Sequence, residues 1–181
     1  KCIEELKSNN SYDEIIYLTP DGQKLNQSIC NNLSLKQNII LLCGHYKGID
    51  ERVMEKYVTH EYSLGDFVMT GGEIPAMVML DSAVRLIPGT LNNLDSALTD
   101  SFSQDLLDHP HYTHPREIDG MEVPDVLFGG YHAKIEAWKQ EQKEKRTQEK
   151  KPDLWKKFEK LKKQRERIVT ATSPSNKYHT R

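Results

Sequence analysis

The 181-residue sequence contains little cysteine and no long apolar run. Its three cysteines, Cys2, Cys30 and Cys43, are odd in number and show no C-x-x-C spacing. This argues against a disulfide framework and favours a reducing compartment, and the cysteines are expected to be small buried residues. No segment approaches the roughly 18 consecutive apolar residues of a membrane-spanning helix, and the mean hydropathy is -0.71. The sequence therefore predicts a soluble protein without membrane contact.

The sequence also lacks an initiator methionine and the common phosphate-binding motifs. It begins at Lys1 without a charged and then apolar signal pattern, so a longer chain is expected upstream. Neither G-x-x-x-x-G-K-[ST] nor G-x-G-x-x-G occurs. A site that cradles nucleotide phosphates on a glycine-rich loop is therefore not expected.

Charge is unevenly distributed, although the net charge is only -2. Residues 132–168 contain 14 Lys plus Arg against 7 Asp plus Glu, and the rest of the chain contains 11 against 20. A basic C-terminal segment on an acidic body suggests a polyanionic partner. The alternative is a helix face that is only solvated.

The N-terminal part alternates short apolar segments, glycine-containing turns and helical patterns. Strands are predicted over Glu14–Leu18, Asn38–Cys43 and Glu61–Met69. Helical spacing occurs in Leu25–Leu33, in Asp50–Tyr57, and in a stripe that stops at Pro88-Gly89 and consists of Ile74, Met77, Val78, Val84 and Ile87. This alternation predicts an α/β domain with a largely parallel sheet over residues 1–89.

A polar segment, residues 90–104, is predicted to be an interdomain linker, either a lid or a disordered connection. Residues 105–181 are predicted to form a small all-α C-terminal domain. Its helices are expected over His132–Lys150 and Pro152–Ile168, where apolar residues recur at helical spacing. The last residues, Asn176–Arg181, are predicted to fray.

Three predicted loops have little side-chain bulk: Thr19–Gly22, Gly44–Gly48 and Thr70–Pro75. Loops that follow the carboxyl ends of parallel strands meet at one edge of a sheet, so the three are expected to converge. Glu73 would repel a phosphate there, whereas backbone N–H and C=O groups suit a nucleoside or amino-acid moiety. The alternative is that the glycines only permit tight turns.

Six segments, in order along the chain, carry a specific family resemblance. They are CGHYKGIDERV (Cys43–Val53), SLGDFVMTGGEIPAM (Ser63–Met77), DSAVRLIPG (Asp81–Gly89), Ser96–Phe102, PHYTHP (Pro110–Pro115) and GMEVPDVLFGGYH (Gly120–His132). Together they closely resemble the bacterial tRNA (guanine-37-N1)-methyltransferases of the TrmD family. The resemblance spans about residues 15–146 without large gaps.

The resemblance implies a fold, a reaction and partners. The fold is a SPOUT-type parallel sheet with a deep C-terminal trefoil knot, joined by a flexible linker to a helical domain that grips tRNA. The reaction transfers the methyl group of S-adenosylmethionine to N1 of guanosine 37 of tRNA, next to the anticodon, and so maintains the reading frame. A homodimer, a cytoplasmic location and Mg²⁺ as a candidate cofactor are also implied, without an assigned metal ligand.

By resemblance, the methyl donor contacts the three loops and the residues before them. The matching positions are Leu18, Thr19, Pro20, Gly44, Tyr46, Leu64, Gly65, Asp66, Phe67, Val68, Met69, Gly71, Gly72 and Pro75. The glycines would let backbone amides approach the donor, and Glu73 is tolerated because a sulfonium donor brings no phosphate. His45 and Lys47 stand where relatives commonly have Arg and Glu, which affects how the ammonium end of the donor is neutralised.

Methylation of guanine at N1 requires a base for the N1 proton and a cation for the negative charge that gathers on O6. The resemblance assigns these roles to Asp100 and Arg85, respectively. An exposed carboxylate is a weak base, so the role requires that Asp100 lose contact with water when the linker closes. The residues alone also allow Asp100 as a helix N-cap and Arg85 as a cation at a helix C-terminus.

Other residues leave alternatives open. Asp108, His109, His111 and His114 offer zinc ligands, but their spacing differs from common structural sites and no cysteine is near, which favours an entrance to the second domain. Trp138 is either a core residue or a stacking platform, on the helix that also carries His132 and Arg146. Two rival functions remain: a non-catalytic RNA-binding adaptor, and a related methyltransferase that acts on a different RNA.

Overall fold

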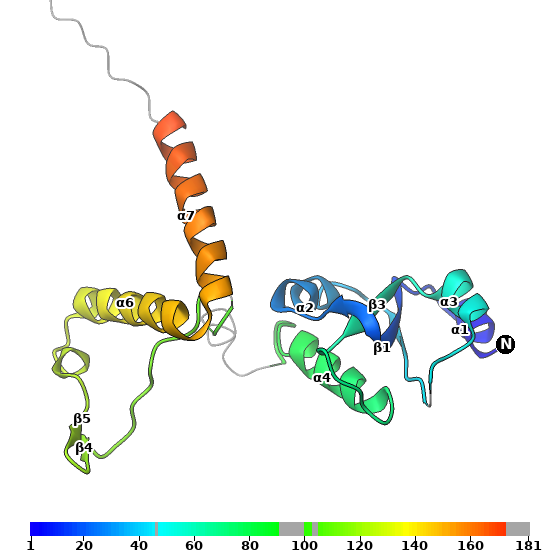
Figure 1. Cartoon of the computed structure of the whole chain (residues 1–181), viewed down its shortest axis with the longest axis horizontal. Helices are drawn as coiled ribbons and strands as arrows, with labels where there is room; N and C mark the ends of the chain where they lie inside the picture. The colour runs from blue at the N-terminus through cyan, green and yellow to red at the C-terminus, as the bar shows by residue number, and fades with distance from the viewer. Residues whose placement is uncertain (46, 91–99, 103–104, 173–181) are drawn as a thin grey trace, which may run out of the picture. The chain divides into compact units, whose positions relative to one another are not determined.

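The computed structural model describes residues 1–45, 47–90, 100–102 and 105–172, with only the backbone described for residues 169–172. The chain divides into two compact units, unit 1 at Lys1–Ala97 and unit 2 at Leu98–Arg181 (Figure 1). This division falls inside the predicted linker, residues 90–104. Most of that segment lies outside the described residues, so its role as a lid stays a prediction.

Unit 1 contains a small parallel sheet and four helices. The strands are β1 (Glu14–Lys24), β2 (Ile39–Leu42) and β3 (His60–Ser63), in the order β2-β1-β3, and both neighbouring pairs are parallel. The helices are α1 (Cys2–Asn9), α2 (Gln27–Leu33), α3 (Glu51–Tyr57) and α4 (Glu73–Val84). Figure 1 shows α2 beside α4, and α1 beside α3. The predicted α/β class with a parallel sheet is confirmed.

Strand β1 differs from its prediction because it continues through the segment that was expected to be a turn. Leu18 and Gln23 both pair with Tyr62 of β3, so the residues between them leave the ladder and then return to it. Strand β3, in contrast, is shorter than predicted and ends at Ser63. The chain from Leu64 to Met69 is therefore a loop, although its apolar residues resemble a strand in sequence.

The core of unit 1 lies between the sheet, α2 and α4. It consists of Ile16, Leu18, Ile29, Leu33, Tyr62, Met79 and Ala83. The buried face of α4 is formed by Ala76, Met79 and Ala83, whereas Ile74, Met77, Val78 and Ile87 of the predicted stripe are exposed. The small alanines let α4 pack closely, and the larger apolar side chains remain on the outside.

The prediction for the cysteines is correct for only one of them. Cys30 is buried, whereas Cys2 and Cys43 are exposed. Cys30 lies on the face of α2 that also buries Ile29 and Leu33.

Unit 2 contains the two predicted helices, α6 (His132–Lys150) and α7 (Pro152–Thr172). It is not entirely α-helical, because β4 (Glu117–Ile118) and β5 (Met121–Glu122) form an antiparallel hairpin, followed by the short helix η1 (Asp125–Leu127). The turn residues Asp119 and Gly120 have φ angles of 52° and 77°, as a two-residue Asp-Gly hairpin turn requires. Among the described residues, no helix is both long and apolar enough to cross a membrane.

A buried hydroxyl joins α6 to the segment before the hairpin. Thr147 is fully buried. Its Oγ1 accepts a hydrogen bond from the backbone N–H of Leu107 at 2.8 Å and donates one to the carbonyl oxygen of Lys143 at 2.7 Å. Leu106, the residue before Leu107, is buried as well, so this contact fixes the segment that follows Asp100 onto α6.

We predict that Thr147→Val destabilises unit 2 by about 1 to 2 kcal/mol, because valine keeps the volume but leaves the Leu107 N–H without its acceptor. Urea unfolding measures the loss, and amide exchange at Leu107 is expected to become faster. A variant with wild-type stability and a protected Leu107 amide would contradict the assigned role.

Candidate functional site

A cavity of unit 1, about 400 Å³ in volume, lies at the carboxyl ends of the strands. Twelve of the fourteen residues predicted to bind the methyl donor line it: Leu18, Thr19, Pro20, Gly44, Leu64, Gly65, Phe67, Val68, Met69, Gly71, Gly72 and Pro75. The three loops therefore converge. Of the other two, Tyr46 lies outside the described residues, and Asp66 is directed to Lys24, with Oδ2 and Nζ 3.1 Å apart.

The cavity depends on close backbone contact between two of its loops. A Cβ atom at Gly72 would lie 2.7 Å from Cα of Cys43 and 2.9 Å from the backbone nitrogen of Gly44. The N–H of Gly72 donates a hydrogen bond to the carbonyl oxygen of Gly44 at 2.9 Å. Gly72 has a φ of -82°, which other residues also adopt. A glycine is required at this position because there is no room for a Cβ atom. Its amide already has a protein acceptor, so the predicted amide contact with a ligand does not extend to Gly72.

A side-chain hydrogen bond also joins the same two loops. His45 Nε2 and Glu73 Oε1 are 2.5 Å apart. The backbone N–H of Glu73 lowers the pKa of its carboxyl, partial burial opposes this, and the hydrogen bond to His45 lowers it further. Glu73 does not belong to the described cavity lining. The carboxylate that was expected to repel phosphate at the mouth is therefore bound to His45.

The described lining of the cavity carries one acid and one base, Asp21 and Lys47. The other lining residues that the sequence analysis missed are Tyr17, Gly48, Tyr62, Ser63 and Thr70. Burial, with smaller contributions from the charges of Glu61 and Asp21, raises the pKa of Tyr17, so its phenol is neutral. Ser63 and Tyr62 end β3, and Tyr17 lies near the end of the first predicted strand, so the same rule about strand ends identifies them.

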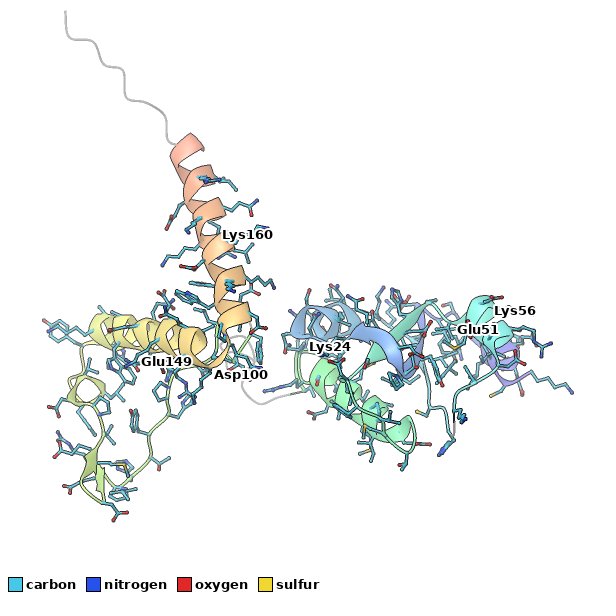
Figure 2. The ribbon with its side chains drawn as sticks, in the orientation of Figure 1. Lys24, Glu51, Lys56, Asp100, Glu149 and Lys160 are labelled. Atoms are coloured by element: carbon cyan, nitrogen blue, oxygen red, sulfur yellow. The ribbon has the colours of Figure 1, made fainter. Side chains whose placement is uncertain are left out.

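The two predicted catalytic residues belong to different units. Arg85 is the C-cap residue of α4 in unit 1 and is exposed. Asp100, labelled in Figure 2, is partly buried in unit 2. The next residue, Ser101, accepts a hydrogen bond through Oγ from the backbone N–H of Asp108 at 2.9 Å. Residues 101 and 102 form a turn and not the first turn of a helix, so Asp100 is not an N-cap of that segment.

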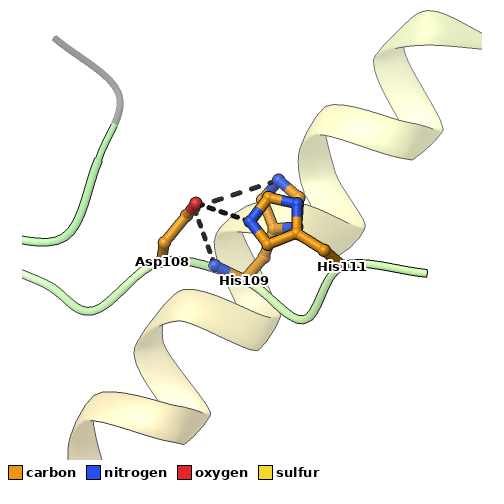
Figure 3. Close-up of side chains that lie close together, drawn as sticks. All are labelled: Asp108, His109 and His111. Atoms are coloured by element: carbon orange, nitrogen blue, oxygen red, sulfur yellow. Dashed lines mark hydrogen bonds and ion pairs between the residues drawn. The ribbon is translucent and has the colours of Figure 1, made fainter. Parts of the chain in front are cut away.

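Asp108 is the centre of a charged cluster in unit 2 (Figure 3). His111 Nε2 lies 2.8 Å from Oδ2, the backbone N–H of His109 donates to Oδ1 at 2.8 Å, and Lys143 Nζ lies 3.3 Å from Oδ1. Burial raises the pKa of Asp108, but the hydrogen bonds from His111 and His109 and the nearby charges of His109 and Lys143 outweigh it and lower the pKa.

The same cluster offers three donor groups within 4.8 Å of one another, from Asp108, His109 and His111. The ammonium of Lys143 already lies beside the carboxylate and would repel a metal ion. His114, the fourth residue considered in the sequence, is not part of the group. We therefore interpret the cluster as a hydrogen-bonded anchor between the His109–His111 segment and α6, and we assign no metal to it.

We predict that Gly72→Ala lowers the free energy of unfolding by about 1 to 3 kcal/mol, because its methyl group would collide with backbone that has no rotamer to change. Gly71→Ala is the matched control: its Cβ would meet Glu73 Oε2 at 2.5 Å and His45 Cε1 at 3.2 Å, the ends of two side chains that are able to move. Urea unfolding compares the two. Equal losses would contradict the role given to the Gly72 contact.

The sequence of the chain is similar to that of a known protein family. The family described as tRNA (Guanine-1)-methyltransferase TrmD matches residues 1–157. A tRNA (guanine-N(1)-)-methyltransferase of Chlorobaculum tepidum is 55% identical over 153 residues, which are 84% of this chain and 66% of the relative.

Two further relatives carry the same description. The protein of Christiangramia forsetii is 55% identical over 154 residues, 85% of this chain and 68% of the relative. That of Bacteroides thetaiotaomicron is 51% identical, with the same shares covered. The chain spans about two thirds of the length of these curated relatives. From the matched residues and this level of identity, the chain belongs to the tRNA (guanine-1)-methyltransferase TrmD family.

Proposed function

We propose that the protein containing this chain transfers a methyl group from S-adenosylmethionine to N1 of guanosine 37 of tRNA. The observation that carries the proposal is the cavity at the strand ends, which is lined by twelve of the donor-binding positions inferred from the family resemblance. The family membership supports the reaction class. A knotted SPOUT-type catalytic domain, a cytoplasmic site of action and a tRNA-binding role for the helices of unit 2 belong to the same proposal.

The cavity suits a donor of this chemistry. Its volume of about 400 Å³ lies within the range of small-molecule sites, roughly 300 to 1,000 Å³. Asp21 and Lys47, on separate loops of the lining, offer opposite charges to the ammonium and carboxylate of an amino-acid moiety. Relatives commonly have an acid at position 47, where this chain has Lys47. In its place, Asp21 supplies the carboxylate that binds the ammonium of the donor. Mg²⁺ stays a candidate without assigned ligands.

When bound, the donor supplies an electrophilic methyl group on a positively charged sulfur. Asp100 accepts the proton of guanine N1, and the electron pair left on N1 forms the new bond to the methyl carbon, while the pair of the carbon–sulfur bond would stay on sulfur, which leaves as a neutral thioether. The guanidinium of Arg85 stabilises the negative charge on O6. The described hydrogen bond between Ser101 and Asp108 fixes the chain next to Asp100, and the aspartate thereby keeps a defined position within unit 2.

Asp100→Asn is expected to reduce the single-turnover rate of methyl transfer by about 10² to 10⁴, because the amide has no basic oxygen for the N1 proton. Binding of tRNA and of the donor is expected to stay near wild type. Rapid-quench measurement with labelled donor gives the rate, and calorimetry gives the affinities. Near-normal transfer by this variant would refute the base assignment.

The exposed apolar face of α4 supports a homodimer. Ile74, Met77, Val78 and Leu80 are 42–68% exposed, which is unusual for neighbouring apolar residues on one helix and is typical of an interface. Ile74, Val78, Asp81 and Arg85 follow one another at steps of four, three and four residues. Arg85 therefore lies at the end of this face. A second copy that covers the face would therefore also lie against Arg85.

Met77→Glu is expected to weaken dimerisation by about 3 kcal/mol, or roughly a hundredfold in the dissociation constant, because it places a carboxylate in an apolar interface. Methyl transfer should fall in parallel at low protein concentration. Sedimentation velocity measures the change in oligomeric state. Met77→Leu, which keeps the face apolar, is the control. A Met77→Glu variant with wild-type association would show that the face is not the interface.

A further inference from the structure

Helix α7 carries two kinds of cation. On the side that packs against α6, Leu154, Phe158 and Leu161 are half-buried. Two lysines that flank this side are already neutralised. Lys157 Nζ lies 2.6 Å from Asp105 Oδ1, and Lys162 Nζ lies 3.7 Å from Glu144 Oε1. These two lysines fasten α7 to the rest of unit 2.

Four of the other five cations of α7 form a separate row, which we name the α7 cationic stripe: Lys156, Lys160, Lys163 and Arg167. They follow one another at steps of four, three and four residues, so they share one face of the helix. This face is opposite to the apolar one. All four side chains are exposed, and Lys160 is labelled in Figure 2. Within the described part of the chain, none of the four takes part in an ion pair, in contrast to Lys157 and Lys162.

The stability of α7 does not explain the stripe. Like charges three or four residues apart on a helix repel each other and weaken it. Asp153 and Glu159 lie three residues from Lys156, and Glu159 and Glu166 lie four and three residues from Lys163, whereas Lys160 and Arg167 have no acid three or four residues away. From Lys156 to Arg167 the stripe extends over 11 steps of the helix, or about 16 Å at the rise of an α-helix. Such a row of charges fits a partner with regularly spaced negative charges.

We propose that the α7 cationic stripe binds the phosphodiester backbone of the tRNA substrate. The inference rests on the proposed function, because tRNA is the polyanion on which that function acts. Three of the four residues lie beyond residue 157, where the match to the family ends, so the stripe is a contact additional to the part shared with the family. Phosphate contacts position an RNA without reading its bases, and the stripe therefore contributes affinity and not choice of nucleotide.

The test compares two double variants on the same helix in the full protein. Lys160→Gln with Lys163→Gln removes two stripe charges, and Lys157→Gln with Lys162→Gln removes two charges that carboxylates already neutralise. Dissociation constants for unmodified tRNA are measured over a series of salt concentrations. For the stripe variant, the slope of log K against log salt is expected to become shallower by about 1.4 to 1.8, since each phosphate contact contributes roughly 0.7 to 0.9. The control should keep the wild-type slope.

A stripe variant with the wild-type slope, or two variants with equal changes, would overturn the proposal. A wild-type slope together with lost binding to phosphatidylserine vesicles would assign the stripe to an anionic membrane surface and overturn it as well. Circular dichroism confirms that α7 remains helical in both variants.

Measurement of methyl transfer distinguishes a failure of the stripe proposal from a failure of the proposed function. The stripe variant is expected to have a higher KM for tRNA and an unchanged kcat. Absence of methyl transfer by the wild-type protein would refute the proposed function itself.

Discussion

The close approach of two loop backbones, at Gly72 and at Cys43–Gly44, is the constraint on which the rest of unit 1 depends. The hydrogen bond from Gly72 to Gly44 joins the loop after β2 to the start of α4. These two loops form part of the cavity wall, so the contact fixes the backbone of that part. The His45–Glu73 pair adds a weaker, exposed connection at the same junction.

This junction also determines what α4 presents to its surroundings. Gly72 is the N-cap of the helix, and Ala76, Met79 and Ala83 face the core, so the helix can approach the sheet closely on one side only. The bulkier residues Ile74, Met77 and Val78 are left on the opposite side. The helix therefore connects three parts of the proposed mechanism: the donor cavity at its N-terminus, the candidate dimer face along its length, and Arg85 at its end.

The parts of the fold with strong local signals were predictable from sequence. Apolar runs gave the three strands, and the caps Asn26 and Asp50 accept the hydrogen bonds that start α2 and α3. The Asp119-Gly120 hairpin also had a recognisable signal and was missed. The outward orientation of the α4 stripe was not predictable, because helical spacing shows that residues share a face but not which face the core selects. Placement of Asp21 and Lys47 in the cavity lining likewise depended on tertiary contacts, and the donor positions themselves came from family resemblance.

Tyr62 of β3 pairs with both Leu18 and Gln23 of β1. The register of the sheet therefore does not depend on the length of the loop between Leu18 and Gln23. Both ends of the loop are held at one residue of β3, so amino acids can be gained or lost between them during evolution without sliding either strand. Side-chain changes can therefore be accommodated at Thr19–Asp21, whereas Gly22 has to remain glycine, because a Cβ atom there would lie 2.5 Å from the backbone nitrogen of Tyr62.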